Sequence, residues 1–126
     1  MIQVSHLKKI YSNGLEVLRD VNATIGRGEV ISIIGPSGTG KSTFLRCLNL
    51  LESPSGGSIV VAGQNLLDSK TNVAKLRQKM GMVFQNFNLF NHMSVMDNLC
   101  IGPVKLLGKS RKEEEERAVE LLTMVG

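Results

Sequence analysis

The sequence predicts a mixed α/β layered fold, on three observations. Polar and apolar residues alternate over 2–6, and an apolar-rich region follows over 15–25, which is typical of two half-buried strands. The run 29–34 is short, apolar and rich in β-branched residues, as in a buried strand of a parallel sheet. Residues 43–51 have the periodicity of a helix with one apolar face. An antiparallel pair followed by a strand, a loop and a helix is typical of a layered α/β domain.

The loop between that strand and that helix has the form of a phosphate-binding loop. Its sequence, Gly35-Pro36-Ser37-Gly38-Thr39-Gly40-Lys41-Ser42, fits the P-loop pattern G-x-x-x-x-G-K-[ST]. Glycines let the backbone approach an anion closely, successive N–H groups then point inward, and the helix adds the positive end of its dipole. An ordinary glycine-rich turn would not need the whole pattern between a strand and a helix. The motif therefore predicts binding of a nucleoside triphosphate.

Three side chains of the loop have expected roles. We expect Lys41 to reach the β- and γ-phosphates and the Ser42 hydroxyl to bind Mg²⁺. Thr43 is placed to bond the α-phosphate.

The composition fits one small domain and limits the classes of partner. The chain has 126 residues and 42% hydrophobic residues, enough for a packed core. Aromatic residues make up only 4%, which weighs against a surface for stacking bases, and the net charge of +4 is scattered, so we expect no nucleic-acid partner. The sequence contains no run of eighteen apolar residues, so it predicts no membrane-spanning helix. Cys47 and Cys100 have no metal-binding spacing and are expected to be buried free thiols in a reducing cytoplasm.

The middle of the chain predicts three further elements. A short strand is expected over 58–62, a short helix over 68–79 and an apolar strand over 80–84. The last of these ends at Gln85, and ligands bind beyond the carboxyl ends of strands in parallel α/β sheets. Gln85 is therefore a candidate for contact with Mg²⁺ or with a water at the γ-phosphate, and a simple cap of the strand end is the alternative.

The last third predicts two helices, each with a capping-box start. Ser94 with Asp97 begins a helix that Gly102-Pro103 is expected to end, and Ser110 with Glu113 begins a second one. The acidic run 113–116 is expected to be a solvated face near the positive end of the helix dipole.

Two further features leave alternatives open. Tyr11, the only tyrosine, could stack on an adenine that the phosphate loop itself does not hold, or it could be a partly buried residue at a strand end. Phe87, Leu89 and Phe90 lie in an asparagine-rich stretch and could form a partner surface, or they could tuck under a helix.

The acidic residues do not supply the remaining parts of a hydrolase. P-loop hydrolases hold Mg²⁺ through an acid at the end of an apolar strand, and no Asp or Glu in these 126 residues follows such a run. We therefore expect phosphate binding without competent turnover by these residues alone.

The motifs resemble those of a known family. The P-loop through Thr43, Tyr11 ahead of it and Val83-Phe84-Gln85 after it resemble the nucleotide-binding domain of ABC transporters. The stretch 87–95 with Asn98 and Pro103 is most similar to ATP-binding subunits of polar amino-acid importers. Lipoprotein-releasing and peptide-exporting members of the family have similar sequences in this region. The resemblance covers the chain from end to end.

The resemblance implies roles for the site residues. It implies an ABC-type P-loop NTPase core with an antiparallel β portion, which binds ATP and Mg²⁺. The loop residues Gly35 to Thr43 hold the phosphates, Ser42 and Gln85 bind the metal, and Lys41 and Gln85 take part in catalysis. Tyr11 stacks on the adenine.

The resemblance also implies an organisation and partners. Residues 1–90 correspond to part of the ATP-binding core and 91–126 to the start of a helical subdomain. The Phe87–Phe90 region and the helices after it receive a membrane permease, and a second ATP-binding subunit completes a homodimer at the cytoplasmic face of the cell membrane. The family's Leu-Ser-Gly-Gly-Gln signature, Walker B strand, D-loop and switch histidine are not found, so the chain resembles the N-terminal half only.

Two other classes remain as alternatives. A self-contained P-loop kinase or GTPase would need an acceptor-site lid or an Asn-Lys-x-Asp motif, and neither is found. A non-enzymatic nucleotide-binding or interaction module is compatible with the lack of hydrolytic residues.

Overall fold

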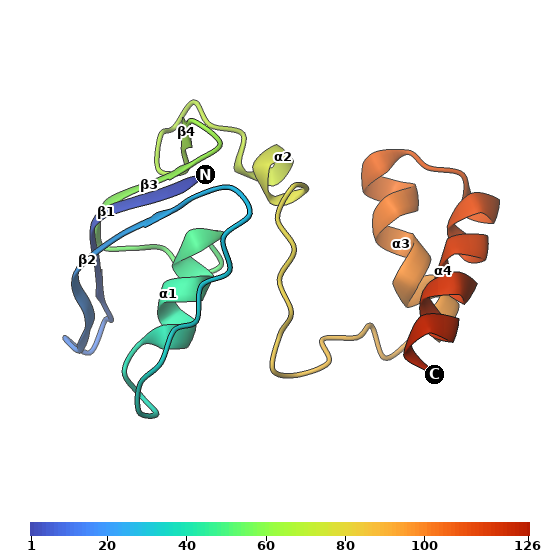
Figure 1. Ribbon diagram of the computed structural model, residues 1–126, viewed down its shortest axis with the longest axis horizontal. Coiled ribbons are helices and arrows are strands. Elements are labelled where there is room, and N and C mark those ends of the chain that lie inside the picture. Colours follow the sequence, from blue (N-terminus) through green and yellow to red (C-terminus); the bar gives the residue numbers. More distant parts are fainter. The chain divides into compact units, whose positions relative to one another are not determined.

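A computed structural model describes all 126 residues, and the chain divides into two compact units, Met1–Met80 and Gly81–Gly126 (Figure 1). The first unit holds a sheet and two helices, and the second holds two helices. The elements in chain order are β1 (Ile2–Ile10), β2 (Glu16–Ile25), α1 (Lys41–Leu48), β3 (Gly56–Val61), β4 (Gln64–Asn65), α2 (Val73–Arg77), α3 (Val95–Leu107) and α4 (Arg111–Val125). A helix with the length and hydropathy needed to span a bilayer is not found.

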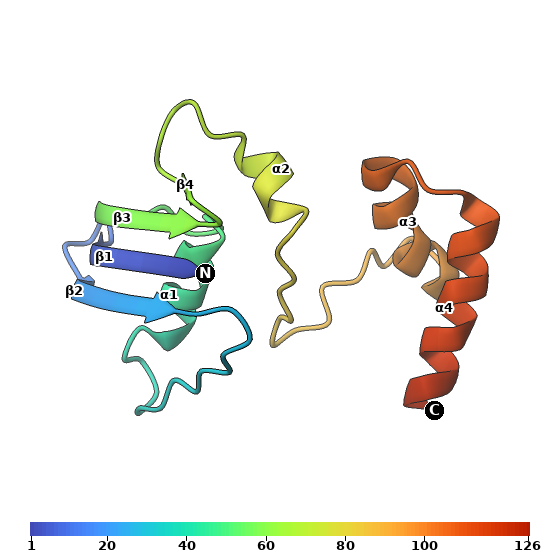
Figure 2. The same ribbon diagram turned by 45° about the horizontal axis from the view of Figure 1, so that its top comes forward.

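The sheet is antiparallel throughout and has the strand order β2-β1-β3-β4. Figure 2 shows β3, β1 and β2 side by side with α1 on one face of them. The core lies between that face and the helix, because apolar side chains of both are buried there. These are Val4, Leu7, Leu18 and Ile59 from the strands and Phe44, Cys47 and Leu48 from α1. The apolar face expected for the helix after the loop is thus confirmed for Phe44 and Leu48, whereas Leu51 lies beyond its end and is 49% exposed.

An irregularity in β1 changes which residue faces the core. Strict alternation would turn His6 inward, but the pairing register shifts between Val4 and Leu7, and His6 has a φ of 50°. As a result His6 is exposed and Leu7 is completely buried. Opposite this bulge, Gly57 of β3 has a φ of 92°, and a Cβ there would lie 2.4 Å from the His6 carbonyl oxygen. A glycine is therefore required for β3 to approach the bulge.

The two strands expected in a parallel sheet are not formed. Residues 29–34 and 80–84 are extended but belong to no sheet, and Val30, Ile34 and Val83 are each more than 90% exposed. A strand needs a neighbour to bond its N–H and C=O groups, and no other segment of the chain pairs with these two. Both expectations were wrong, because an apolar run indicates burial but does not show whether another segment is present to pair with it.

The helix expected over 68–79 is shorter than predicted and spans only α2. Asn72 caps it, since its side chain accepts a hydrogen bond from the Lys75 N–H at 3.0 Å. The residues before Asn72 form turns instead, with Lys70 N–H bonded to the Asp68 carboxylate. Local side-chain bonds of this kind compete with a helix, which explains the later start.

The first helix of the second unit runs through the residue expected to end it. Pro103 lies inside α3, which continues to Leu107 and ends at Gly108 with a φ of 66°. The Gly108 and Lys109 N–H groups both bond the Pro103 carbonyl, so the proline's own carbonyl helps to close the helix. Near the end of a helix a proline removes one donor, and the later residues still form their bonds.

The two expected capping boxes behave differently. Ser94 caps α3 as predicted, since its hydroxyl accepts from the Asp97 N–H at 3.1 Å. Ser110 makes no side-chain cap on α4, and its carbonyl accepts from the Glu114 N–H instead. The prediction of a side-chain cap on α4 was therefore wrong, although the helix itself begins where it was expected.

Charged residues join α3 to α4. Arg111 bonds Asp97 at 2.7 Å and Glu115 at 2.6 Å, and these carboxylates raise the pKa of Arg111. Ser94 and Arg111 lower the pKa of Asp97. Glu114 is only 7% exposed and pairs with Lys109 at 3.0 Å, so this member of the acidic run is not on a solvated face as predicted.

The C-terminal end of α1 is held by a residue from α2. The Arg77 guanidinium donates from Nε to the Asn49 carbonyl at 2.8 Å and from Nη2 to the Leu50 carbonyl at 2.7 Å. Unpaired carbonyls and the negative end of the helix dipole both favour a cation at this position. Arg77 therefore fixes the helix that follows the phosphate loop.

The substitution Gly57→Ala should destabilise the first unit strongly. The positive φ alone costs about 1–2 kcal/mol for a residue with a Cβ, and the clash with backbone atoms at His6 adds a cost of similar size. Gly63→Ala is the matched control, because its φ is 79° but no atom lies within 4 Å of the added Cβ. Chemical unfolding should show a clearly larger loss for Gly57→Ala, and equal losses would contradict the bulge geometry.

Replacing Arg77 by methionine should lower stability by about 1 kcal/mol, since two charge-assisted hydrogen bonds to helix carbonyls are removed while the aliphatic stem is kept. Lys75→Met on the same short helix is the control, because Lys75 is exposed and its ammonium bonds no protein atom. Thermal unfolding of the variants measures the difference. A similar effect of both substitutions would show that charge on α2, not the cap, is responsible.

Candidate functional site

The phosphate loop leaves the N-terminus of α1 open. Gly38 and Gly40 have φ values of 81° and 88°, and Gly40 is the residue directly before the helix. No side chain caps α1, and its first turn contains no acidic residue. The positive end of an eight-residue helix therefore lies beside the loop without a negative group of the protein to balance it.

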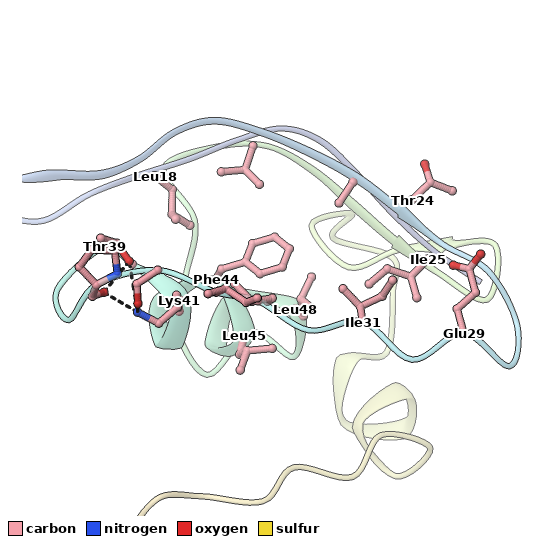
Figure 3. A pocket seen from close by; sticks show the side chains of 17 residues that line it. Leu18, Thr24, Ile25, Glu29, Ile31, Thr39, Lys41, Phe44, Leu45 and Leu48 are labelled. Atoms are coloured by element: carbon pink, nitrogen blue, oxygen red, sulfur yellow. Dashed lines mark hydrogen bonds between the residues drawn. The ribbon is translucent and has the colours of Figure 1, made fainter.

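Lys41 lies along the inside of the loop. Its ammonium group donates to the Gly35 carbonyl at 2.7 Å, to the Pro36 carbonyl and to the Thr39 hydroxyl at 3.3 Å (Figure 3). Lys41 takes part in none of the ion pairs. Carbonyl dipoles orient this ammonium group, but its charge has no counter-ion in the protein.

Strand β2 forms one wall of the site. Val17 and the loop residues 37–43 line a hollow of about 530 Å³. A Cβ at Gly40 would lie 2.8 Å from Cγ1 of Val17 and 3.1 Å from its carbonyl oxygen. A glycine is therefore needed at position 40 for two reasons: it adopts a positive φ, and it leaves room for the loop to pack closely on β2. No sequence signal connects Val17 with the loop.

A larger hollow of about 800 Å³ lies between β2, α1 and the extended segment 29–36 (Figure 3). Its lining is mainly apolar, with Leu18, Ile31, Ile33, Phe44 and Leu48 among the contributors. A surface of this kind favours apolar side chains over a phosphate. The smaller hollow at the loop is therefore the candidate anion site.

Tyr11 lies next to this site. It follows β1 directly, and its hydroxyl is 3.3 Å from the Thr43 hydroxyl in the first turn of α1. Residues 32 positions apart are thus brought together, which places the one tyrosine at the downstream end of the phosphate loop.

Gln85 and the aromatic segment belong to the second unit, whereas the loop belongs to the first. Gln85 lies in a bend after the extended residues 80–84. Phe87, Leu89 and Phe90 are 94%, 58% and 52% exposed. These exposures favour the first alternative, an exposed apolar surface, over burial of the three residues under a helix.

Asn98 holds the exposed segment in shape. Its Oδ1 accepts from the Phe90 N–H at 2.8 Å, and its Nδ2 donates to the carbonyls of Phe90 at 3.2 Å and Ser94 at 2.9 Å. A single amide side chain thus ties the loop to the start of α3. Sequence reasoning used Asn98 only as part of a resemblance and missed this role.

Metal ligands from the protein are few at the loop. No group of three or more His, Cys, Asp or Glu side chains lies close enough together to hold a metal ion. Both cysteines are buried and free, as predicted.

Comparison with known proteins identifies relatives along the whole chain. The arginine transport ATP-binding protein ArtM of Bacillus subtilis is 48% identical over 126 residues, which is all of this chain and 52% of ArtM. The histidine/lysine/arginine/ornithine transport ATP-binding protein HisP of Escherichia coli is 48% identical over 136 residues and is also matched over 52% of its length. The chain thus spans about half the length of these curated relatives.

Solved structures show the same fold. A structure titled as dimeric MJ0796, a bacterial ABC transporter cassette, superposes with a TM-score of 0.88 at 36% identity and covers 98% of this chain and 56% of the other. A post-hydrolysis state of the same cassette, bound to ADP and Pi, gives a TM-score of 0.87 at 35% identity. The predicted ABC-type P-loop NTPase fold, with an antiparallel β portion and helices, is therefore confirmed.

The family model described as ABC transporter matches residues 18–126, which is most of the chain and includes the phosphate loop and the exposed aromatic segment. The chain belongs to the ABC transporter family.

Proposed function

We propose that the chain is part of an ATP-hydrolysing subunit that energises import of a polar amino acid through a membrane permease. The main support for a nucleotide site is the open N-terminus of α1, which lies beside a hollow of about 530 Å³. Lys41 lines this hollow, and its ammonium group is bonded to loop oxygens and to no carboxylate. The names of the relatives support the transport role, since ArtM and HisP are transport ATP-binding proteins for basic amino acids.

The loop residues fit a triphosphate with its magnesium ion. Backbone N–H groups over 38–43 and the helix dipole would hold the phosphate oxygens, and Lys41 would move from the loop carbonyls to the β- and γ-phosphates. The Ser42 hydroxyl is exposed at the first turn of α1 and would be the protein ligand of Mg²⁺. When bound, Mg²⁺ neutralises charge on the β- and γ-phosphates. Tyr11 would stack on the adenine, with Thr43 near the α-phosphate.

Gln85 would contact Mg²⁺ and the attacking water and would link the state of the nucleotide to the permease. Because no acidic residue of the 126 follows an apolar strand, we propose that these residues bind ATP without hydrolysing it by themselves. Measurement of ATP hydrolysis by the 126-residue chain tests this point. Turnover at an ordinary enzymatic rate would contradict it.

The partner surfaces are proposed from the second unit. Phe87 to Phe90 form an exposed apolar segment that suits a helix of a permease, and the helices after it would be the start of a helical subdomain over 91–126. The structure titled as dimeric supports a pair of ATP-binding subunits. Such an assembly would work at the cytoplasmic face of the membrane, with residues 1–90 contributing part of the ATP-binding core.

Lipoprotein release and peptide export remain the alternative transport roles, and a non-enzymatic nucleotide-binding module is the alternative outside transport. The substrate that stimulates ATP hydrolysis when the full chain is reconstituted with its permease separates these functions.

Lys41→Ala should weaken ATP binding strongly, because it removes the one cation that lies inside the loop. We expect a loss of affinity of at least about tenfold by isothermal titration calorimetry of the full chain. Lys79→Ala is the control, since Lys79 lies after α2 on an exposed surface away from the loop. An unchanged affinity of the Lys41 variant would refute the phosphate site.

Phe87→Ser should weaken binding of the permease by at least about tenfold while leaving thermal stability unchanged, because the side chain is 94% exposed. Co-purification of the full chain with its permease in detergent measures this. Leu106→Ser, 65% exposed on α3, is the control for loss of an exposed apolar side chain in the same unit. Equal retention of both variants would contradict the docking role of Phe87.

A further inference from the structure

The Tyr11 ring has a charged neighbour on one face. The Lys9 ammonium nitrogen lies 4.9 Å from the centroid of this ring, within the range of a cation–π contact. The ring has no aromatic neighbour. Its hydroxyl is placed separately, by the Thr43 hydroxyl at 3.3 Å. Two contacts, one at the face and one at the edge, thus define the orientation of the ring.

Lys9 is itself held firmly. Its ammonium group pairs with Glu52 Oε1 at 2.6 Å and donates to the Ser53 carbonyl at 2.7 Å. The Lys9 side chain is only 11% exposed, so the group is kept at the ring and not free in solvent. Pairing with Glu52 raises the pKa of Lys9, and the group therefore remains charged at neutral pH.

The segment that holds Lys9 is fixed to both α1 and β1. The Glu52 N–H bonds the Arg46 carbonyl at the end of α1. Ser55 bonds the other side, because its hydroxyl accepts from the Ile10 N–H at 2.9 Å and its N–H donates to the Lys8 carbonyl at 2.7 Å. The support of the Tyr11 ring is therefore connected to the same helix whose first turn would hold the phosphates.

We propose that Lys9 is a positioning residue for the nucleotide base: held by Glu52 and Ser53, it occupies one face of Tyr11 and fixes the ring plane, so that the base stacks on the opposite face. This inference rests on the proposed nucleotide-binding function. A ring held in place before binding loses less entropy when the base arrives, which raises affinity for the base without adding a contact to it. Lys9 lies behind the ring, so it should not affect the triphosphate.

The experiment compares ATP with inorganic tripolyphosphate, which has the phosphates but no base. Affinities of both for the full chain are measured by isothermal titration calorimetry with Mg²⁺ present. The variants are Lys9→Met, Lys9→Arg, Glu52→Gln and Tyr11→Leu, and Lys8→Met is the matched control because Lys8 is the exposed neighbour in the same strand. Circular dichroism melting verifies that each variant is folded.

Lys9→Met should lower ATP affinity by about two- to tenfold, the cost of ordering one side chain on binding, and leave tripolyphosphate affinity unchanged. Glu52→Gln should show a smaller loss of the same kind, while Lys9→Arg and Lys8→Met should keep the original affinities. In the Tyr11→Leu background Lys9→Met should have no further effect, since the ring on which it acts is gone.

Three results would overturn the inference. An equal loss for ATP and tripolyphosphate would show that Lys9 acts on the fold, and no loss for either would show that it does not act at the base. A further loss of ATP affinity when Lys9→Met is added to Tyr11→Leu would show that Lys9 acts on ATP without the tyrosine ring. If the unaltered chain binds neither ATP nor tripolyphosphate, the proposed function fails as well, which distinguishes that outcome from the other three.

Discussion

The structure depends on an unbalanced positive charge at one end of α1. No side chain caps this helix, no acid lies in its first turn, and the ammonium group of Lys41 is bonded only to neutral oxygens of the loop. A side-chain cap in place of Gly40 would add only a few tenths of a kcal/mol, so the open terminus costs the fold little. The positive end of the helix dipole is therefore balanced by no group of the protein. The glycines follow from the same constraint, since Gly40 must both adopt a positive φ and pack on Val17.

The charge is useful only because the helix is held still. Phe44, Cys47 and Leu48 bury one face of α1 against the sheet. Its other end is bonded by Arg77 from α2, and Glu52, just after it, reaches back to Lys9 of β1. The helix is thus fixed by apolar contact along its length and by polar contacts at its C-terminal end. Lys41, at the other end of the helix, is bonded only to neutral oxygens of the loop.

Local patterns predicted single elements better than they predicted contacts between distant segments. The helix after the loop and the Ser94 cap depend on residues within a few positions of each other, and both were confirmed. Features that depend on distant residues were missed: the bulge at His6 needs Gly57, and the support of Lys9 needs Glu52. Pro103 was expected to end a helix that its own carbonyl helps to close. The assignment of Gln85 and Tyr11 to the nucleotide stays a prediction, because residue type and position indicate what they can do and not what they bind.

The two failed strand predictions have one physical origin. Val30 and Ile34 are more than 90% exposed, and Ile31, Ile33 and Ile34 line the apolar hollow. A segment that is apolar on both sides is suited to a strand with layers above and below it and a parallel neighbour beside it. In P-loop enzymes such neighbouring strands also carry, at their carboxyl ends, the acidic groups that hold magnesium and the water. The chain spans about half the length of its relatives, and neither the neighbour nor the acid is found among these residues. Residues 29–34 therefore stay unpaired, because no other segment of these 126 residues lies beside them as a strand. The phosphate loop and α1, by contrast, are formed by these residues alone.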